Sequence, residues 1–523
     1  MDDLPREVDV IVLGTGVPES IVAAACARVG KSVLHFDHRS HYGSMFASFN
    51  FHDLTEILQT PPKPSDGDGA ATSEDGLRFI QSRASPVFSN VEIEVNEHSE
   101  WSLEKLEQNS RKFNLDLAPK LLFARGKMVE LLISSNIAKY AEFKLTSKIL
   151  TLKGDDIVQV PCSRADVFAT DSVNVVEKRA LMRFITNVLD YENQPLFTEW
   201  LDKPFEDFIK LKALFLTENL QHFILHSIAM ATPSTTTGSA LEDARKFIRS
   251  LGRYGNSPFL SPIYGCGELA QCFCRLCAVF GGVYHLDRQV EGYFVDEDNR
   301  VRAVRSRGET FRASHVVINQ DFDPSHTSNN EHISRAIVIL HQESPIEEPG
   351  AGTLLRVPPG NDRPAVTVIE QGAGMMICPK NLMVAHFICR KVISAREDLK
   401  ALVEKIYPSS KRVWVAYFNM IDTTMRSKPT TDDFAGLYLM STPGLQLDYD
   451  IHIEQAEEVF RKMYPDEEFL PRAPDPDEII LDFEDGVPQQ PAAEHQGIAQ
   501  ESGDGSESDG SGNPVAEAEQ GPA

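Results

Sequence analysis

The sequence predicts an α/β fold that carries an inserted all-helical domain, and three features of the chain lead to this. Two apolar runs flank an alanine-rich segment within residues 8–37. Residues 111–232 repeat apolar side chains at the spacing of a helix. Strand-like runs then return at 290–295, 301–305, 314–319, 336–340, 365–369, 383–389 and 413–418.

The opening segment predicts a strand, a helix and a second strand. Residues 8–14 (VDVIVLG) form a continuous apolar run that ends in glycine, which is typical of a buried parallel strand. Residues 21–31 read as a helix closed by Gly30 and Lys31, and residues 32–37 read as the next strand. This order is that of the first unit of a dinucleotide-binding, Rossmann-like scaffold.

Shifts in composition suggest how the chain is divided. We expect an α/β domain assembled from residues 1–110 and 233–470, with a helical domain at 111–232 between its two parts. Residues 60–86 are rich in Pro, Gly and Asp, which indicates a flexible insertion within the first part. Residues 484–523 are acidic and rich in Gly and Ser, so we expect a disordered tail.

Charge and composition exclude several functions. The net charge is −26, whereas binding to nucleic acid or to an anionic membrane needs clustered Lys and Arg. No apolar run approaches the ~20 residues of a spanning helix, and the first residues lack the apolar core of a signal peptide. The eight cysteines are too sparse for a disulfide framework, so we expect a reduced, cytosolic protein.

The glycine loop after the first strand departs from the dinucleotide fingerprint. Gly14 and Gly16 are present, but Glu19 occupies the third glycine position and follows Pro18. A carboxylate at the start of a helix would compete with pyrophosphate for the same amides and would repel it. Asp37 does stand where a ribose-binding acid would stand, so flavin or NAD binding remains the alternative; we expect no cofactor.

Other catalytic or metal-binding patterns are weak. The run CFCRLC (272–277) lacks the second ligand pair of a structural zinc site, and small buried thiols are the simpler interpretation. Neither HExxH nor GxSxG occurs in the chain. We therefore expect no metal site, no catalytic residue and no enzymatic activity.

Four segments in this order resemble a known superfamily: GTGVPESI (14–21), VLHFDHRSHYG (33–43), RYGNSPFLSPIYGCGEL (253–269) and QCFCRLCAVFGG (271–282). Together they are similar to the Rab GDP-dissociation inhibitors and Rab escort proteins. The likeness runs through most of residues 5–482 except the insertion. The segments 160–179 and 470–482 resemble the escort branch in particular, whereas His41, Ser44 and Ala270 depart from the usual pattern.

The resemblance implies a GDI-like scaffold without cofactor and a surface that binds Rab GTPases. The residues it implies for that surface are Tyr42, Glu268, Arg275, Val283 and His285, together with Arg253 and Tyr254 of a mobile effector loop. Glu268 and Arg275 are two helical turns apart, and Val283 and His285 alternate on a strand, so each pair can share a face. A surface Glu–Arg pair and an ordinary connecting loop are the plainer alternatives.

The escort branch also implies a surface for the prenyltransferase. The matching residues are Phe168 and Arg179, an apolar anchor and a directional donor about three helical turns apart. A core phenylalanine with a solvated arginine is the alternative that the residues alone would favour.

The function implied by the resemblance is non-catalytic. Such a protein binds unprenylated, GDP-bound Rab and presents it to a separate αβ geranylgeranyltransferase. It then shields the geranylgeranyl lipid and delivers Rab to membranes, where it stays only transiently. A Rab GDP-dissociation inhibitor and a flavin-dependent oxidoreductase remain the alternatives.

Overall fold

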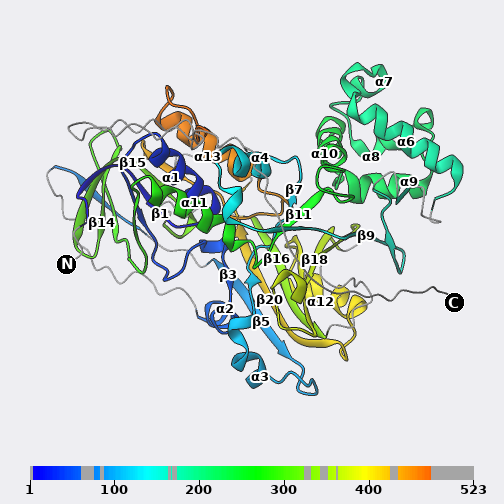
Figure 1. The fold of residues 1–523 in the computed structure, drawn as a ribbon, viewed down its shortest axis with the longest axis horizontal. Helices are drawn as coiled ribbons and strands as arrows, with labels where there is room; N and C mark the ends of the chain where they lie inside the picture. The colour runs from blue at the N-terminus through cyan, green and yellow to red at the C-terminus, as the bar shows by residue number, and fades with distance from the viewer. Residues whose placement is uncertain are drawn as a thin grey trace, which may run out of the picture. The chain divides into compact units, whose positions relative to one another are not determined.

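Two eight-stranded sheets carry most of the strands that the sequence predicts (Figure 1). The computed structural model describes residues 4–60, 76–82, 87–162, 166–167, 173–322, 331–341, 352–360, 363–424 and 434–472. All of them belong to one unit of the chain, Met1–Ala473. The tail expected at 484–523 lies outside the described residues. No helix in the described ranges is long and apolar enough to cross a membrane.

The first sheet is parallel around the predicted opening unit. β1 (Glu7–Leu13) lies between β2 (Val33–Phe36) and β15 (Glu309–Ile318), and all three run in the same direction. The edge strand β12 (Val283–His285) pairs with β2, and β21 (Leu437–Leu439) pairs with β15. The two strands predicted at 8–14 and 32–37 are therefore confirmed to within one residue at each end.

Three helices cover one face of this sheet. α1 (Val17–Arg28) is buried almost throughout, which explains why its alanine-rich sequence has no polar face. It packs between α11 (Gly267–Val279) and α13 (Asp450–Met463) (Figure 1). In its first turn, Ser20 Oγ lies 3.1 Å from the sulfur of Cys274 on α11.

An antiparallel extension completes the first sheet and corrects the expected insertion. β14 (Val301–Ser306) pairs with β15 and with β13 (Gly292–Val295), and β4 (Arg78–Gln81) adds at the edge of β13. A flexible insertion over the whole of 60–86 is therefore wrong at β4. The strand forms because Phe79 packs on Phe294, with ring centroids 5.2 Å apart. Residues 61–75 and 83–86 lie outside the described residues.

The second sheet is mostly antiparallel and follows the order β10-β9-β17-β18-β19-β16-β20-β5. Its long central strands are buried on both faces because α12 (Ala395–Ile406) covers one face and other elements cover the opposite face. The strands are β10 (Asp156–Gln159), β9 (Lys148–Lys153), β17 (Thr353–Val357), β18 (Val366–Gly372), β19 (Leu382–Arg390), β16 (Glu331–His341), β20 (Arg412–Asp422) and β5 (Phe88–Val95).

The inserted helices begin later than the sequence predicts. Helices throughout 111–232 are wrong over 111–160, where short strands dominate and β9 and β10 join the second sheet. The single helix there, α4 (Lys127–Ser134), packs in the core of α1 and α13. Short apolar runs do not distinguish a buried strand from a buried helix, which explains the error.

A separate helical cluster forms from the residues that follow (Figure 1). It also takes in α10, which the sequence division assigned to the α/β domain. Its core includes side chains of β17, β18 and β19, so the cluster rests on the second sheet. Its helices are α6 (Val175–Leu189), α7 (Pro195–Thr198), α8 (Phe205–Ile209), α9 (Glu218–Phe223) with a π turn (Ile224–Ile228), and α10 (Thr237–Ser250).

Candidate functional site

The glycine turn between β1 and α1 is filled by side chains of the protein itself. Gly14 has a φ of +98°, and a Cβ there would lie 2.2 Å from the side-chain amide nitrogen of Asn319. A Cβ on Gly16 would lie 2.3 Å from Oε2 of Glu19. The space beside both glycines, through which a pyrophosphate would approach the backbone, is therefore occupied.

Asp37, which stands where a ribose-binding acid would stand, is fully engaged in holding this turn. Its Oδ2 accepts hydrogen bonds from the backbone N–H and hydroxyl of Thr15 at 2.9 and 2.7 Å and from the hydroxyl of Ser44 at 3.1 Å. Its Oδ1 accepts from the backbone N–H of Arg39 at 2.9 Å. Burial opposes ionisation of Asp37, but the charges of His38 and Arg39 and these donors hold its pKa below the usual range.

Glu19 makes the turn unsuitable for an anion. Its carboxyl is buried in the first turn of α1, and burial, reinforced by the charges of Asp37 and Asp321, raises its pKa to about 8. A pyrophosphate would need the position that this carboxyl occupies, close to two further acidic groups. The residues present do not fit a dinucleotide, since Asp37 is also buried and both of its carboxylate oxygens already accept hydrogen bonds within the protein.

Glu268 and Arg275 of the expected Rab-binding surface both lie on α11. Glu268 is half-buried, and burial together with the neighbouring charge of Glu142 raises its pKa. Arg275 is exposed and stacks on the ring of Tyr140, with its guanidinium carbon 4.3 Å from the ring centroid. The segment 140–142 therefore borders both residues. Its contribution was missed because nothing in the sequence links it to α11.

Val283 and His285 lie on β12, the edge strand of the first sheet. They point to the same face, on which Val283 packs against the apolar core between β2 and β15. Tyr284 points to the opposite face, towards α11, and its ring lies 6.0 Å from that of Tyr42. The structure thus brings Tyr42 next to the middle of β12, and it separates the α11 pair from Val283 and His285 by the thickness of the sheet.

Contacts of Arg253 partly fix the loop that the resemblance implies as an effector loop. Arg253 forms an ion pair with Glu130 of α4 and donates a hydrogen bond to the backbone carbonyl of Ala124 at 2.8 Å. The hydrogen bond to Glu130 raises the pKa of Arg253. Tyr254, in contrast, is 49% exposed. Of the two residues, Tyr254 is therefore the one whose side chain faces solvent.

Arg179, expected to contact a transferase, is exposed on α6. Phe168, its expected companion, lies outside the described residues. The first turn of α6 also presents Val175 and Val176 to solvent, 65% and 75% exposed. These two valines were missed because helical periodicity alone does not indicate which apolar residues remain outside a core.

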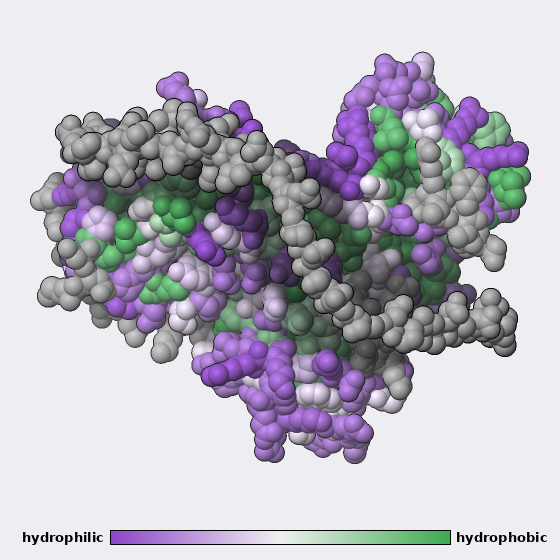
Figure 2. All heavy atoms as spheres, in the orientation of Figure 1, coloured by the Kyte–Doolittle hydropathy of each residue, from purple (hydrophilic) through white to green (hydrophobic). Residues whose placement is uncertain are grey.

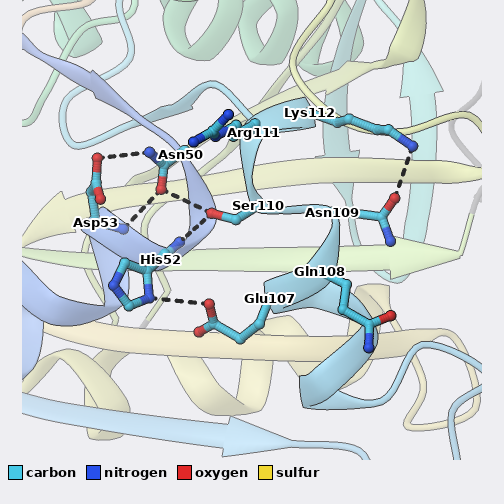
Figure 3. A pocket seen from close by; sticks show the side chains of 9 residues that line it. All are labelled: Asn50, His52, Asp53, Glu107, Gln108, Asn109, Ser110, Arg111 and Lys112. Carbon is cyan, nitrogen blue, oxygen red and sulfur yellow. Dashed lines mark hydrogen bonds and ion pairs between the residues drawn. The ribbon is translucent and has the colours of Figure 1, made fainter.

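A polar surface pocket lies between α2 (Phe51–Gln59) and α3 (Leu103–Gln108), away from all of these residues (Figure 3). Several of its side chains bond one another: Ser110 donates to Asn50 at 2.9 Å, and His52 Nδ1 lies 3.1 Å from Glu107. The eight cysteines, including those of CFCRLC, are all buried, and burial raises the pKa of Cys274 to about 12. Within the described ranges no group of His, Cys, Asp or Glu is arranged to hold a metal ion.

The architecture defines a class: a Rossmann-like scaffold with a filled cofactor turn and an inserted helical cluster. The family described as GDP dissociation inhibitor matches residues 2–73 and 93–357, and the family described as RAE1/2 domain I, C-terminal region, matches residues 333–445. The chain therefore belongs to the GDP dissociation inhibitor family, in the branch of the Rab geranylgeranyltransferase component A proteins.

Several curated relatives support this placement. "Rab proteins geranylgeranyltransferase component A" of Drosophila melanogaster is 36% identical over 93% of this chain and 94% of that protein. "Component A 2" of Homo sapiens is 32% identical over 94% of this chain and 95% of its own. The "Rab GDP-dissociation inhibitor" of Saccharomyces cerevisiae is 29% identical over 66% of this chain and 70% of its own.

Solved structures agree on the fold. The crystal structure of Rab GDI from Plasmodium falciparum superposes with a TM-score of 0.65, at 17% identity, over 88% of this chain and 99% of that one. An oxidoreductase from Methanosarcina mazei superposes with a TM-score of 0.52 at 12% identity, over 87% of this chain and 100% of that one. The expected fold class is confirmed, since a GDI and an oxidoreductase share this scaffold.

Proposed function

We propose that this chain is a Rab escort protein, the non-catalytic accessory subunit of Rab geranylgeranylation. It binds newly made Rab in the GDP form and presents the cysteines at the Rab C-terminus to a separate αβ geranylgeranyltransferase. It then shelters the attached lipid and delivers Rab to membranes. The observation that carries the proposal is that relatives named as component A of this transferase align with 93% and 94% of the chain.

Physical reasoning makes the division of labour sensible. A GTPase tail of variable sequence gives an enzyme little to recognise, whereas an adaptor that holds the GTPase body raises the local concentration of the tail at the active site. The attached lipid needs an apolar shelter, because burial of each CH₂ group contributes ~0.8 kcal/mol. The helical cluster, whose core is rich in Phe and Leu, is where we expect this shelter.

We propose that the Rab body binds on the side of α11 and β12. The exposed Arg275 and the half-buried Glu268 offer a base and an acid on α11, and the edge strand β12 borders them with Val283 and His285 on the other face of its sheet. Tyr42 and Tyr254 would add aromatic contacts of the kind found at interface hot spots. Arg253 acts by positioning the loop, because Glu130 already holds its guanidinium.

The proposed absence of catalysis rests on the geometry of the glycine turn. Glu19 and Asn319 fill the space beside Gly16 and Gly14, and Asp37 is used by Thr15 and its neighbours. The oxidoreductase alternative requires a flavin, and flavin extracted from the purified chain in stoichiometric amount would contradict the proposal. We expect the protein to work in the cytosol, with only transient visits to membranes.

Reconstituted prenylation is the direct test. GDP-loaded Rab, the αβ transferase and geranylgeranyl diphosphate are combined with and without this chain, and lipid incorporation is followed over time. Incorporation should require the chain and saturate near one chain per Rab. A chain that extracts prenylated Rab from vesicles but gives no incorporation would instead act as a GDP-dissociation inhibitor, the second candidate suggested by the yeast relative.

A further inference from the structure

Arg335 on β16 is a charged residue in the interior of the protein. Hydrophilic side chains cover the outside of the lobe that carries α2 and α3 (Figure 2), as is usual for charged groups. Arg335, in contrast, is only 1% exposed. Ile333 and Ile337 share its face of the second sheet and belong to the apolar core on the side opposite α12. A charge in such a position costs free energy unless it is paired and its N–H groups are bonded.

One edge of the Arg335 guanidinium has no partner in the protein. Nε and Nη2 are both buried, and among the residues that the structure describes none accepts a hydrogen bond from either nitrogen. No ion pair engages Arg335 within the described ranges. The ring of Phe418 on β20 is near, with its centroid 6.0 Å from the guanidinium carbon, but a contact at this distance neutralises no charge.

Other arginines of the chain use the same edge to hold an oxyanion. Nε and Nη2 of Arg396 both donate to Oε1 of Glu94, at 3.2 and 3.0 Å. The buried Arg288 donates from Nη2 to the carboxylate of Glu309, and its Nε donates to a serine hydroxyl at 3.0 Å. The Nε–H and Nη2–H bonds form a fork that matches the two oxygens of a planar oxyanion. Arg335 presents this fork without a group of the chain to fill it.

His386 on β19 is the neighbour of Arg335 on the same buried face. His386 pairs with Ile337, two residues along β16 from Arg335, so the two side chains are diagonal neighbours. His386 is fully buried, and neither of its ring nitrogens has a hydrogen-bond partner in the part of the chain that the structure describes. Burial and the charge of Arg335 hold the pKa of His386 well below its usual value. The neutral ring therefore has one N–H to donate.

Asp116 on β6 (Leu115–Asp116) is the acid whose charge acts most on Arg335. Its Oδ1 is already used, because it accepts hydrogen bonds from the Ser48 hydroxyl at 2.5 Å and from the backbone N–H of Cys266 at 2.9 Å. Burial raises the pKa of Asp116, which weakens it further as a counter-ion. Asp116 is thus a neighbour of Arg335 and not its ion-pair partner.

We propose that Arg335 and His386 form an internal binding site for a small planar oxyanion, either a short monocarboxylate or bicarbonate. Two oxygens of the ligand accept the N–H groups of the Arg335 fork, and the N–H of His386 donates a further hydrogen bond. The ligand compensates the buried positive charge and joins β16 to β19 at the centre of the second sheet. The site lies apart from α11 and β12, and the inference does not depend on the proposed function.

Thermal unfolding of the full chain in formate tests this. The chain is dialysed into sodium chloride and titrated with sodium formate or, in a second arm, with sodium bicarbonate, at constant ionic strength. The arm that acts at the lower concentration identifies which of the two oxyanions the site prefers. That ligand should raise the Tm by about 2 °C or more along a saturating curve, because it binds only the folded state. A rise that is linear in concentration for both salts would be a general salt effect and would overturn the proposal.

Three variants locate the effect. Arg335→Lys keeps the charge and loses the fork, so the saturating rise should disappear. His386→Phe leaves Arg335 intact and should raise the half-saturating formate concentration about tenfold, since one hydrogen bond to a charged ligand is lost. Arg288→Met is the matched control: Arg288 is also buried but already binds Glu309, so this variant should have a lower Tm and the full response to formate. An unchanged response in Arg335→Lys would overturn the proposal.

A crystal structure of the chain grown in formate gives the direct outcome. Planar density against Nε and Nη2 of Arg335 would support the site. An ordered water only at this position, or a direct ion pair between Arg335 and Asp116, would overturn it.

Discussion

The side chains of the glycine turn are buried and paired, whereas those on the outer side of α6 and at the nearby Phe215 are exposed. At the turn, Asp37 and Ser44 satisfy the hydrogen-bonding groups, and Glu19 fills the space beside Gly16. Arg179 on α6 and Phe215 on the segment before α9 face water. The contrast teaches that one scaffold can fill an inner turn with its own side chains and still leave apolar and basic groups exposed on an outer helix.

The largest effect that would sharpen this contrast is expected at Asp37. Asp37→Ala should lower the free energy of unfolding by about 3–5 kcal/mol, because buried donors, including the Thr15 hydroxyl and the Ser44 hydroxyl, lose their acceptor. Urea unfolding at neutral pH measures the loss. Asp466→Ala, at an exposed residue of the turn after α13, is the matched control and should change little. Equal losses would mean that the turn is not held by this carboxylate.

A second, pH-dependent effect is expected at Glu19. Its pKa of about 8 in the folded protein exceeds its usual value near 4.5, so the folded state retains a proton that the unfolded chain releases. Stability from this residue is present below pH 4.5 and is lost as pH rises towards 8. Glu19→Gln should therefore be more stable than wild type by on the order of 5 kcal/mol at pH 9, since the pKa rises from 4.5 to about 8 and one pKa unit is worth ~1.36 kcal/mol.

Unfolding midpoints across pH 4–9 test this, with the exposed Glu7→Gln as the control. The advantage of Glu19→Gln should shrink steadily as pH falls and vanish near pH 4.5. An advantage that is the same at every pH would show that the carboxyl of Glu19 is ionised in the folded protein.

On the outer side of the comparison, charge reversal at Arg275 should affect binding and spare stability. Arg275→Glu loses the contact with Tyr140 and places a second acid on α11 with Glu268, so affinity for GDP-loaded Rab should fall tenfold to a hundredfold, about 1.4–2.7 kcal/mol. Calorimetric titration measures it. Arg461→Glu on α13 reverses the charge of an exposed arginine that pairs with Glu457, and this variant should bind Rab as wild type does. Unchanged affinity for Arg275→Glu would remove α11 from the Rab surface.

The smallest effect is expected at Val176. Val176→Ser should change the free energy of unfolding by less than about 0.5 kcal/mol, because this side chain is 75% exposed. Leu181→Ala, on the buried side of the same helix, should cost about 2–5 kcal/mol. Thermal unfolding of the two variants compares the two sides of α6. A loss above 1 kcal/mol for Val176→Ser would mean that this valine packs in the core and does not face solvent.

The sequence was sufficient for the elements with long or strongly patterned runs. The opening strands, the long central strands such as β16 and the placement of Glu268 and Arg275 on one helix all agree with the structure. The strand β9 was misassigned, because a short buried run such as residues 149–152 does not distinguish a strand from a helix. β4 was missed because its pairing with β13 and its contact with Phe294 join segments far apart in the chain.

The sequence likewise predicted some residues of the candidate site and missed others. The sequence predicted from its position that Glu19 would obstruct pyrophosphate by its charge. The structure shows that its buried carboxyl occupies the space beside Gly16. It did not reveal Phe215, Val175 or Val176, because an apolar residue in a helical stretch reads as core until its surroundings are known. Nor did it reveal Tyr140 beside Arg275, a contact between segments far apart in the chain.

The packing of α11 on α1 has a consequence for substitutions in the glycine turn. The helix that carries Glu268 and Arg275 rests on a helix whose first residues form the glycine turn, and Ser20 and Cys274 fasten the two together. We expect a substitution that shifts α1 at the turn to shift α11 as well, together with Glu268 and Arg275. The side chains that fill the turn therefore also support, through α1, the helix on which the expected Rab-binding pair lies.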